Sequence, residues 1–117
     1  MEVTLSSDPV ATNPDLYRVI FENERVRVLE YRDRPGVRTT PHSHPDSVMI
    51  TLSSFQRRLI ADDRSVDVEL EAGQARWIAG QSHAGENIGS SESHAMFIEL
   101  KEPPASSSSA QPLGPEG

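Results

Sequence analysis

The sequence predicts an all-β domain, an antiparallel double-sheet jelly roll or β-barrel. Short β-prone runs recur along most of the chain, and turn-forming glycine, proline, serine and aspartate residues separate them. No stretch keeps the hydrophobic period of an amphipathic helix for three turns. Many short strands at close spacing are typical of sandwiches and barrels rather than of helical or α/β domains.

The first strands are predicted from alternation and from turn residues. Residues 17–21 form a compact β-prone run, and residues 25–31 alternate arginine with valine before becoming apolar. Residues 22–24 form the turn between them, which makes this pair a hairpin candidate. The Pro35-Gly36 pair then marks a turn before a strand over residues 37–44.

The later strands follow the same logic. Residues 47–52 are almost continuously apolar, which is typical of a central strand, and residues 66–70 alternate with three apolar side chains on one face. Aspartate and glycine turns separate the rest. The remaining strands are expected at residues 55–61, 74–78, 83–88 and 94–100.

Composition predicts one domain with a tail at each end. The chain has 117 residues, a length that fits a single domain. Residues 1–15 are polar, contain two prolines and show no period, so we expect a flexible N-terminal arm that could lie along a partner subunit. Residues 103–117 are rich in proline and serine and predict a disordered tail. The folded β-barrel domain is expected over residues 16–102.

Charge and composition exclude several classes of function. The net charge is -7 and no basic run is present, which argues against nucleic acid as a partner. The apolar runs are far shorter than the roughly 20 residues of a membrane span. There is no cysteine, hence no disulfide framework and no thiolate metal site. The first residues lack the features of a signal peptide, so we expect a cytoplasmic protein.

Three histidines predict a metal centre. His42 and His44 are two residues apart on an expected strand, so their side chains point to the same side. Histidine is the commonest metal ligand among side chains. His83, which lies downstream between turn glycines, can supply a third nitrogen. The prediction is a three-histidine metal site inside a small β-barrel.

The spacing of these residues resembles the two motifs of the cupin superfamily. The first motif is a glycine, five residues and His-x-His, and the second places a glycine three residues before a histidine and an asparagine four after it. The chain has the matching residues in the same order: Gly36, His42 and His44, then Gly80, His83 and Asn87. The resemblance implies a small RmlC-like jelly roll with a metal at the barrel centre.

The chain departs from this family where a glutamate ligand usually follows the second histidine. Val48 and Met49 occupy those positions, and neither has a carboxylate that could bind a metal ion. The proline usual before the second-motif glycine is also absent. What the resemblance implies is therefore a three-histidine cupin, similar in ligand set to thiol dioxygenases and the diketone-cleaving dioxygenase. One divalent transition metal is expected, with Fe(II) favoured and Ni, Co, Cu, Zn and Mn as alternatives.

The missing carboxylate has an electrostatic consequence. Three neutral imidazoles leave a divalent ion with its full formal charge, so such a centre should prefer an anionic, chelating small molecule. Three protein ligands also leave coordination positions open, which is the arrangement of a catalytic rather than a structural metal.

Strand parity suggests further site residues. Arg38 and Thr40 should share the face of the first histidine pair, although a proline lies between, and Arg38 is the candidate for holding a substrate carboxylate. Asn87 should point inward with the third histidine and is the other candidate catalytic residue. Gln56 is a weaker candidate partner for an imidazole. His94, which begins the last strand, is expected at the surface or core edge.

The leading hypothesis is a metal-dependent enzyme, an oxygenase or another metal-assisted catalyst acting on a small anionic molecule. A non-catalytic cupin that binds a small ligand or senses metal is the alternative. A metal-free RmlC-type sugar epimerase is disfavoured, because its nucleotide-sugar groove needs aromatic residues that are scarce here. The resemblance and the small core also imply a homodimer.

Overall fold

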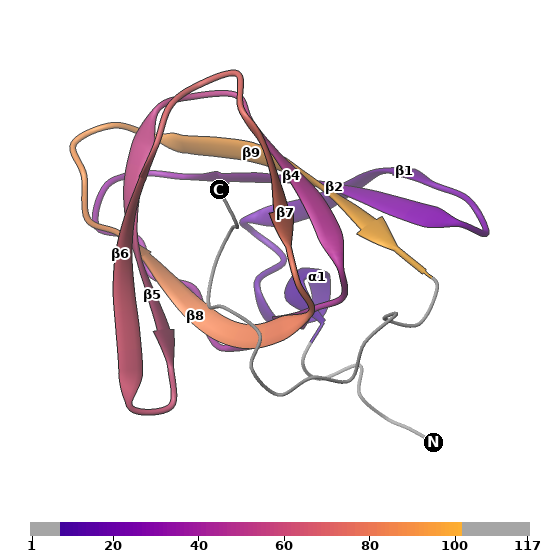
Figure 1. The fold of residues 1–117 in the computed structure, drawn as a ribbon, viewed down its shortest axis with the longest axis horizontal. Helices are drawn as coiled ribbons and strands as arrows, with labels where there is room; N and C mark the ends of the chain where they lie inside the picture. Colours follow the sequence, from indigo (N-terminus) through magenta and orange to yellow (C-terminus); the bar gives the residue numbers. More distant parts are fainter. Residues whose placement is uncertain (1–7, 102–117) are drawn as a thin grey trace.

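In the computed structural model, which describes residues 8–101, nine strands and one short helix are present (Figure 1). Every strand expected from the sequence is found, within a few residues at its ends. The elements are α1 (Pro9–Thr12), β1 (Tyr17–Glu22), β2 (Val26–Asp33), β3 (His42–His44), β4 (Ser47–Thr51), β5 (Phe55–Ala61), β6 (Arg64–Leu70), β7 (Ala75–Ile78), β8 (Gln81–Asn87) and β9 (Ser93–Leu100).

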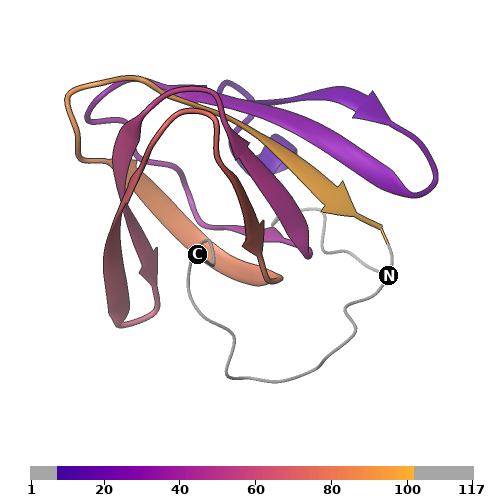
Figure 2. The same cartoon turned by 45° about the horizontal axis from the view of Figure 1, so that its top comes forward.

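The strands form two antiparallel sheets. One sheet has the order β1-β2-β9-β4-β7, and the other has the order β3-β8-β5-β6. Both views show β8 of the second sheet lying opposite β2 and β9 of the first across the interior (Figures 1 and 2). The predicted double-sheet jelly roll is confirmed. Among the described strands the sheets remain two separate layers, and no hydrogen-bonded ladder closes them into a continuous barrel.

The core lies between the two sheets because alternate residues of each strand point inward. Strand β9 shows this most clearly, since its residues alternate strictly between buried and half-buried positions. Nine buried hydrophobic side chains form the main core cluster: Tyr17, Leu29, Tyr31, Met49, Phe55, Leu70, Ile78, Ala95 and Phe97. Polar side chains at inward positions are therefore surrounded by apolar ones, which sets the electrostatics of the site.

The N-terminal segment differs from the flexible arm expected over residues 1–15. Residues 9–12 form helix α1, with Asp8 at its N-cap accepting a hydrogen bond from the Val10 backbone N–H at 3.2 Å. Asn13 joins this segment to the domain, since its Oδ1 accepts a hydrogen bond from the Thr40 backbone N–H at 2.9 Å. The Asp8 cap and the buried Asn13 amide thus order this segment, although its sequence has no helical or strand periodicity. Residues 1–7 and the tail predicted over residues 103–117 lie outside the described residues.

The strand expected over residues 37–44 is shorter than predicted. Only His42–His44 pair as a strand, and Arg38 forms an isolated bridge with Glu86. Gly36, before this segment, has a φ of +86°, a conformation that glycine adopts most readily. Proline cannot donate a backbone hydrogen bond, so Pro41 interrupts the ladder just before the histidines.

A row of apolar side chains crosses the outer face of the five-stranded sheet. The register aligns Phe21, Val28, Ile98, Val48 and Trp77 on its five neighbouring strands. Trp77 is 37% exposed at one end of this row, and Phe21 is 53% exposed at the other end. The homodimer stays a prediction, and this row is a surface on which a second chain could pack.

Within residues 8–101, no helix has both the length and the apolar composition needed to cross a bilayer.

Candidate metal centre

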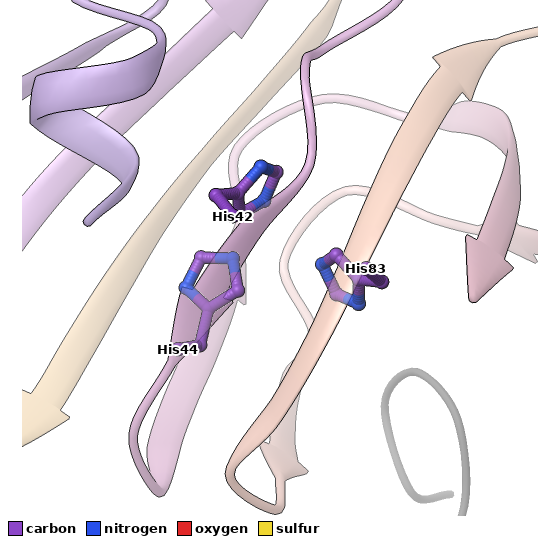
Figure 3. A group of neighbouring side chains, drawn as sticks. All are labelled: His42, His44 and His83. Carbon is purple, nitrogen blue, oxygen red and sulfur yellow. The ribbon is translucent and has the colours of Figure 1, made fainter. Parts of the chain in front are cut away.

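Three imidazoles converge inside the domain, as the sequence predicted. One nitrogen from each of His42, His44 and His83 lies within 4.8 Å of the other two. The convergence follows from strand pairing, because β3 lies antiparallel to β8 with His42 opposite His83. Figure 3 shows the two histidines of β3 beside the one on β8. All three residues are buried, with 2%, 4% and 8% of their surfaces exposed.

Two of the imidazoles are oriented by hydrogen bonds at Nδ1. The His42 Nδ1 donates to the Thr40 backbone carbonyl at 2.8 Å, and the His83 Nδ1 donates to the Gln81 Oε1 at 2.8 Å. The Gln81 amide is itself fixed, because its Nε2 donates to the Ala79 carbonyl at 3.0 Å. Because each Nδ1 faces a hydrogen-bond acceptor, the ring proton must be on Nδ1. The lone pair of Nε2 is then free to bind an ion.

The third imidazole faces a buried carboxylate. The His44 Nδ1 lies 3.6 Å from the Glu99 Oε2, and neither atom has another hydrogen-bond partner within residues 8–101. The other carboxylate oxygen of Glu99 accepts a hydrogen bond from the Arg27 Nε at 2.8 Å, and Arg27 also pairs with Asp8 at the start of α1. Burial raises the pKa of the Glu99 carboxyl, while Arg27 opposes that shift. Glu99 therefore stands where a carboxylate orients a metal-binding histidine.

Sequence analysis missed Glu99, although a signal was present. Strand β9 alternates Ala95, Phe97 and Glu99 on its inward face, so a carboxylate occupies a position that the pattern reserves for apolar residues. A buried charge on an apolar face usually has a specific partner.

The Glu99→Gln variant is expected to bind metal 10- to 100-fold more weakly, which is about the cost of losing an outer-shell carboxylate. Isothermal titration with Zn²⁺ measures this directly. Glu30→Gln is the matched control, because Glu30 bonds His94 on the outer face of the same sheet. Equal affinities of wild type and Glu99→Gln would show that Glu99 has no role in orienting His44.

Burial keeps the histidines neutral. Desolvation lowers the pKa of His42, and desolvation together with the neighbouring imidazoles lowers the pKa of His44 to about 3 and that of His83 to about 2. Neutral imidazoles are the form that binds metal, so protons do not compete for these nitrogens near neutral pH.

A phenol lies against the same nitrogens. The Tyr17 hydroxyl is 3.3 Å from the His42 Nε2 and 3.5 Å from the His44 Nε2. The ring is 4% exposed. The sequence placed Tyr17 only at the start of the first strand, and nothing in its spacing relative to the histidines indicates this contact.

A small cavity adjoins the histidines. It has a volume of about 40 Å³, and its walls include His42, His83, Arg57 and ten or so mostly apolar side chains of both sheets. A site for one water needs roughly 10–15 Å³ on this measure, so the cavity accommodates only a few non-hydrogen atoms.

Arg57 brings a positive charge into this cavity. Its Nη1 donates to the Asp33 Oδ2 at 2.7 Å and to the Ser93 Oγ at 3.2 Å. The guanidinium carbon lies over the Tyr31 ring, 5.0 Å from the ring centroid. A Cβ at Gly85 would lie 2.7 Å from the Nη2, so the absence of a side chain there makes room for the guanidinium. The sequence reading did not identify Arg57.

Asn87 is buried, with 1% of its surface exposed, but its side-chain amide is already hydrogen-bonded to other residues of the domain. Its Nδ2 donates to the Asp33 Oδ1 at 3.0 Å, to the Ser91 carbonyl at 2.9 Å and to the Ser93 Oγ at 3.2 Å. Its Oδ1 accepts a hydrogen bond from the Gly89 backbone N–H at 3.0 Å. Asn87 therefore positions Asp33, and through it Arg57, rather than contacting a bound molecule.

The other predicted residues lie away from the centre. Arg38 is exposed while its neighbour Thr39 is buried, which reverses the expected parity because the segment before the histidines is not a continuous strand. Gln56 is exposed. His94 lies on the outer face, where its Nε2 is 2.7 Å from the Glu30 Oε2. None of these three contributes to the histidine cluster.

The donor set fits a divalent transition metal. Three neutral imidazoles each bring one nitrogen to the cluster, and each Nδ1 faces an oxygen atom of the protein. Nitrogen ligands of this kind suit Fe(II), Ni, Co, Cu and Zn. The residues present would hold such an ion without rearrangement of the fold.

Fold and site together define a double-sheet β domain built around three histidines. A crystal structure of a cupin domain from Bordetella pertussis Tohama I is 30% identical in sequence to this chain, with a TM-score of 0.69. The match covers 74% of this chain and 93% of that one. The chain therefore belongs to the cupin family.

More distant solved structures share the fold. A cupin superfamily protein from Desulfitobacterium hafniense is 18% identical with a TM-score of 0.55, over 74% of this chain and 77% of that one. The polyketide cyclase RemF from Streptomyces resistomycificus is 20% identical with a TM-score of 0.57, over 75% of this chain and 66% of that one. No protein-family model matches the sequence, and no curated protein matches it.

Proposed function

We propose that this cupin is a metal-dependent enzyme of the cytoplasm, with His42, His44 and His83 as ligands and Fe(II) as the favoured ion. The convergence of one imidazole nitrogen from each of the three histidines is the observation that carries the proposal. Each Nδ1 faces an oxygen, so the geometry is prepared for ligation rather than for packing. The bound ion would supply Lewis-acid or redox chemistry.

The proposed substrate is a compact, anionic molecule. The cavity volume of about 40 Å³ limits how much of it can enter. Arg57 supports an anionic group, because its guanidinium lies at the cavity wall and is held there by the bond from Nη1 to Asp33. The apolar walls exclude water, which strengthens charge interactions inside the cavity.

An oxygenase is the reaction class we favour within this proposal. The protein ligands leave coordination positions for both a donor atom of the substrate and dioxygen. The test is dioxygen consumption by the iron-loaded protein with small diketones, 2-hydroxy acids and thiol amino acids, each at a range of concentrations. Substrate-dependent uptake that disappears in the His83→Ala variant is the expected result.

A non-catalytic cupin that binds metal or a small ligand is the alternative. It predicts stoichiometric metal and tight binding of a compact anion without dioxygen uptake or any chemical change in that anion. Mass spectrometry of the recovered compound separates the two hypotheses, because unaltered compound after prolonged incubation supports binding alone.

A further inference from the structure

We propose that Tyr17 is a fourth protein ligand of the metal centre and binds through its phenolate oxygen. The inference rests on the metal-dependent function proposed above and names a ligand outside the three histidines. Tyr17 comes from β1 at the edge of the five-stranded sheet, whereas the histidines come from the opposite sheet. The centre would therefore join the two layers of the fold.

The distances indicate a ligand rather than a hydrogen-bond donor. The Tyr17 hydroxyl lies 3.3 Å from the His42 Nε2 and 3.5 Å from the His44 Nε2, both longer than the roughly 2.5–3.2 Å of ordinary protein hydrogen bonds. Metal-to-nitrogen bonds of about 2.0–2.1 Å in a tetrahedron give ligand-to-ligand edges of about 3.3–3.4 Å. The phenol oxygen thus lies at the spacing of neighbouring ligands around one ion.

The hydrogen-bond inventory of the hydroxyl supports the same interpretation. Its two polar contacts within residues 8–101 are the two imidazole nitrogens, each of which is an acceptor once its Nδ1 holds the proton. One hydroxyl proton can serve one of these acceptors at a time. A cation between the three atoms satisfies all of them together.

Packing holds the phenol in this position. The Tyr17 ring lies 4.7 Å from the Tyr31 ring and 5.9 Å from the Phe97 ring, measured between centroids. The Tyr17 backbone N–H donates to the Asn13 carbonyl at 3.1 Å, which ties it to the end of α1. Tyr31, by contrast, donates its hydroxyl to Asp33 and is committed to that carboxylate.

The phenolate would restore the negative charge that Val48 and Met49 fail to provide. Ligation replaces the O–H bond of Tyr17 with an oxygen-to-metal bond and releases one proton to the buffer, so a divalent centre falls from +2 to +1. Burial raises the pKa of Tyr17 in the metal-free chain, and the charge of a bound ion acts in the opposite direction.

Copper(II) loading with visible absorption and resonance Raman spectroscopy tests this ligand. A phenolate bound to copper(II) gives a visible charge-transfer band with phenolate ring vibrations in resonance. We expect that signal in wild type and in Tyr31→Phe, and its loss in Tyr17→Phe, which should still bind about one copper per chain through the histidines. Tyr31→Phe is a matched control, since the chain contains only two tyrosines.

The Tyr31→Phe background also provides a test that does not depend on folding of the Tyr17 variant. Fluorotyrosine incorporated into that variant occupies position 17 alone, so it should shift the charge-transfer band. Copper bound at one per chain without a phenolate signal in wild type, or a signal that persists in Tyr17→Phe, overturns the Tyr17 proposal. Absence of bound copper in wild type instead contradicts the metal centre itself and its fourth ligand with it.

Discussion

Replacing His42 and His44 together by alanine is expected to lower the metal content from about one ion per chain to none. The double variant removes two of the three imidazoles, and the remaining His83 holds an ion too weakly to survive desalting. Both side chains are buried against Tyr17 or Phe97, so circular dichroism of the variant must show that the sheets remain folded. Inductively coupled plasma mass spectrometry of the purified proteins measures the content.

His94→Ala is the matched control for this experiment. His94 pairs with Glu30 on the outer face of the five-stranded sheet and takes no part in the histidine cluster. We expect this variant to retain the wild-type metal content. Full retention of metal in the double variant would end the three-histidine interpretation, because an ion must then reside elsewhere.

Replacing Asp33 by alanine is expected to destabilise the domain by about 3–5 kcal/mol, the cost of removing one partner of a buried ion pair. Asp33 is 3% exposed, and its carboxylate accepts hydrogen bonds from Arg57, Tyr31, Asn87 and the Ser93 backbone. Its loss leaves the Arg57 guanidinium buried without a counter-charge. Urea unfolding followed by circular dichroism measures the change in the free energy of unfolding.

The Asp67→Ala variant is the control for Asp33→Ala. Asp67 pairs with Arg58, which neighbours Arg57 on β5 but points to solvent, with the Arg58 Nε 2.8 Å from the Asp67 Oδ1. Exposed pairs of this kind contribute little to stability, so the unfolding midpoint should stay unchanged. Similar unfolding midpoints for the Asp33 and Asp67 variants would mean that the Asp33 and Arg57 pair is not a buried anchor of the fold.

Together these variants separate two roles of polar groups in the interior. The histidines and Tyr17 face one another and would serve a bound ion. The network of Asp33, Arg57 and Asn87 holds a positive charge at the cavity wall and links β2, β5 and β8. Loss of the first set should abolish metal binding, whereas loss of Asp33 should lower the free energy of unfolding and leave the three histidines in place.

Local sequence was sufficient for the strands and for the histidine pair. The two-residue period of a strand puts His42 and His44 on one face, and this rule depends on nothing distant in the chain. Apolar runs, alternation and turn residues located the other strands, although the strand before the histidines was predicted too long. The motif spacing then linked His83 to the pair, because fixed intervals between turn glycines and histidines reflect one recurring arrangement of strands.

Counting alternate residues gave a wrong side-chain direction where the backbone was not a strand. Arg38 was assigned to the histidine face by counting residues through Pro41, but the chain before β3 is irregular and Arg38 faces solvent. Asn87 was correctly expected inside, yet its partners come from β2 and from the segment just before β9, which a local count cannot reveal.

Sequence by itself determined where the strands lie and that His42 and His44 share a face, because both depend on short-range periodicity, and the motif spacing added His83. Only the tertiary structure decided the surroundings of those imidazoles. Tyr17, Arg57 and Glu99 come from β1, β5 and β9 and reach the interior through the pairing and facing of sheets. Contacts between separate strands depend on register and sheet packing, and these quantities are properties of the folded chain as a whole.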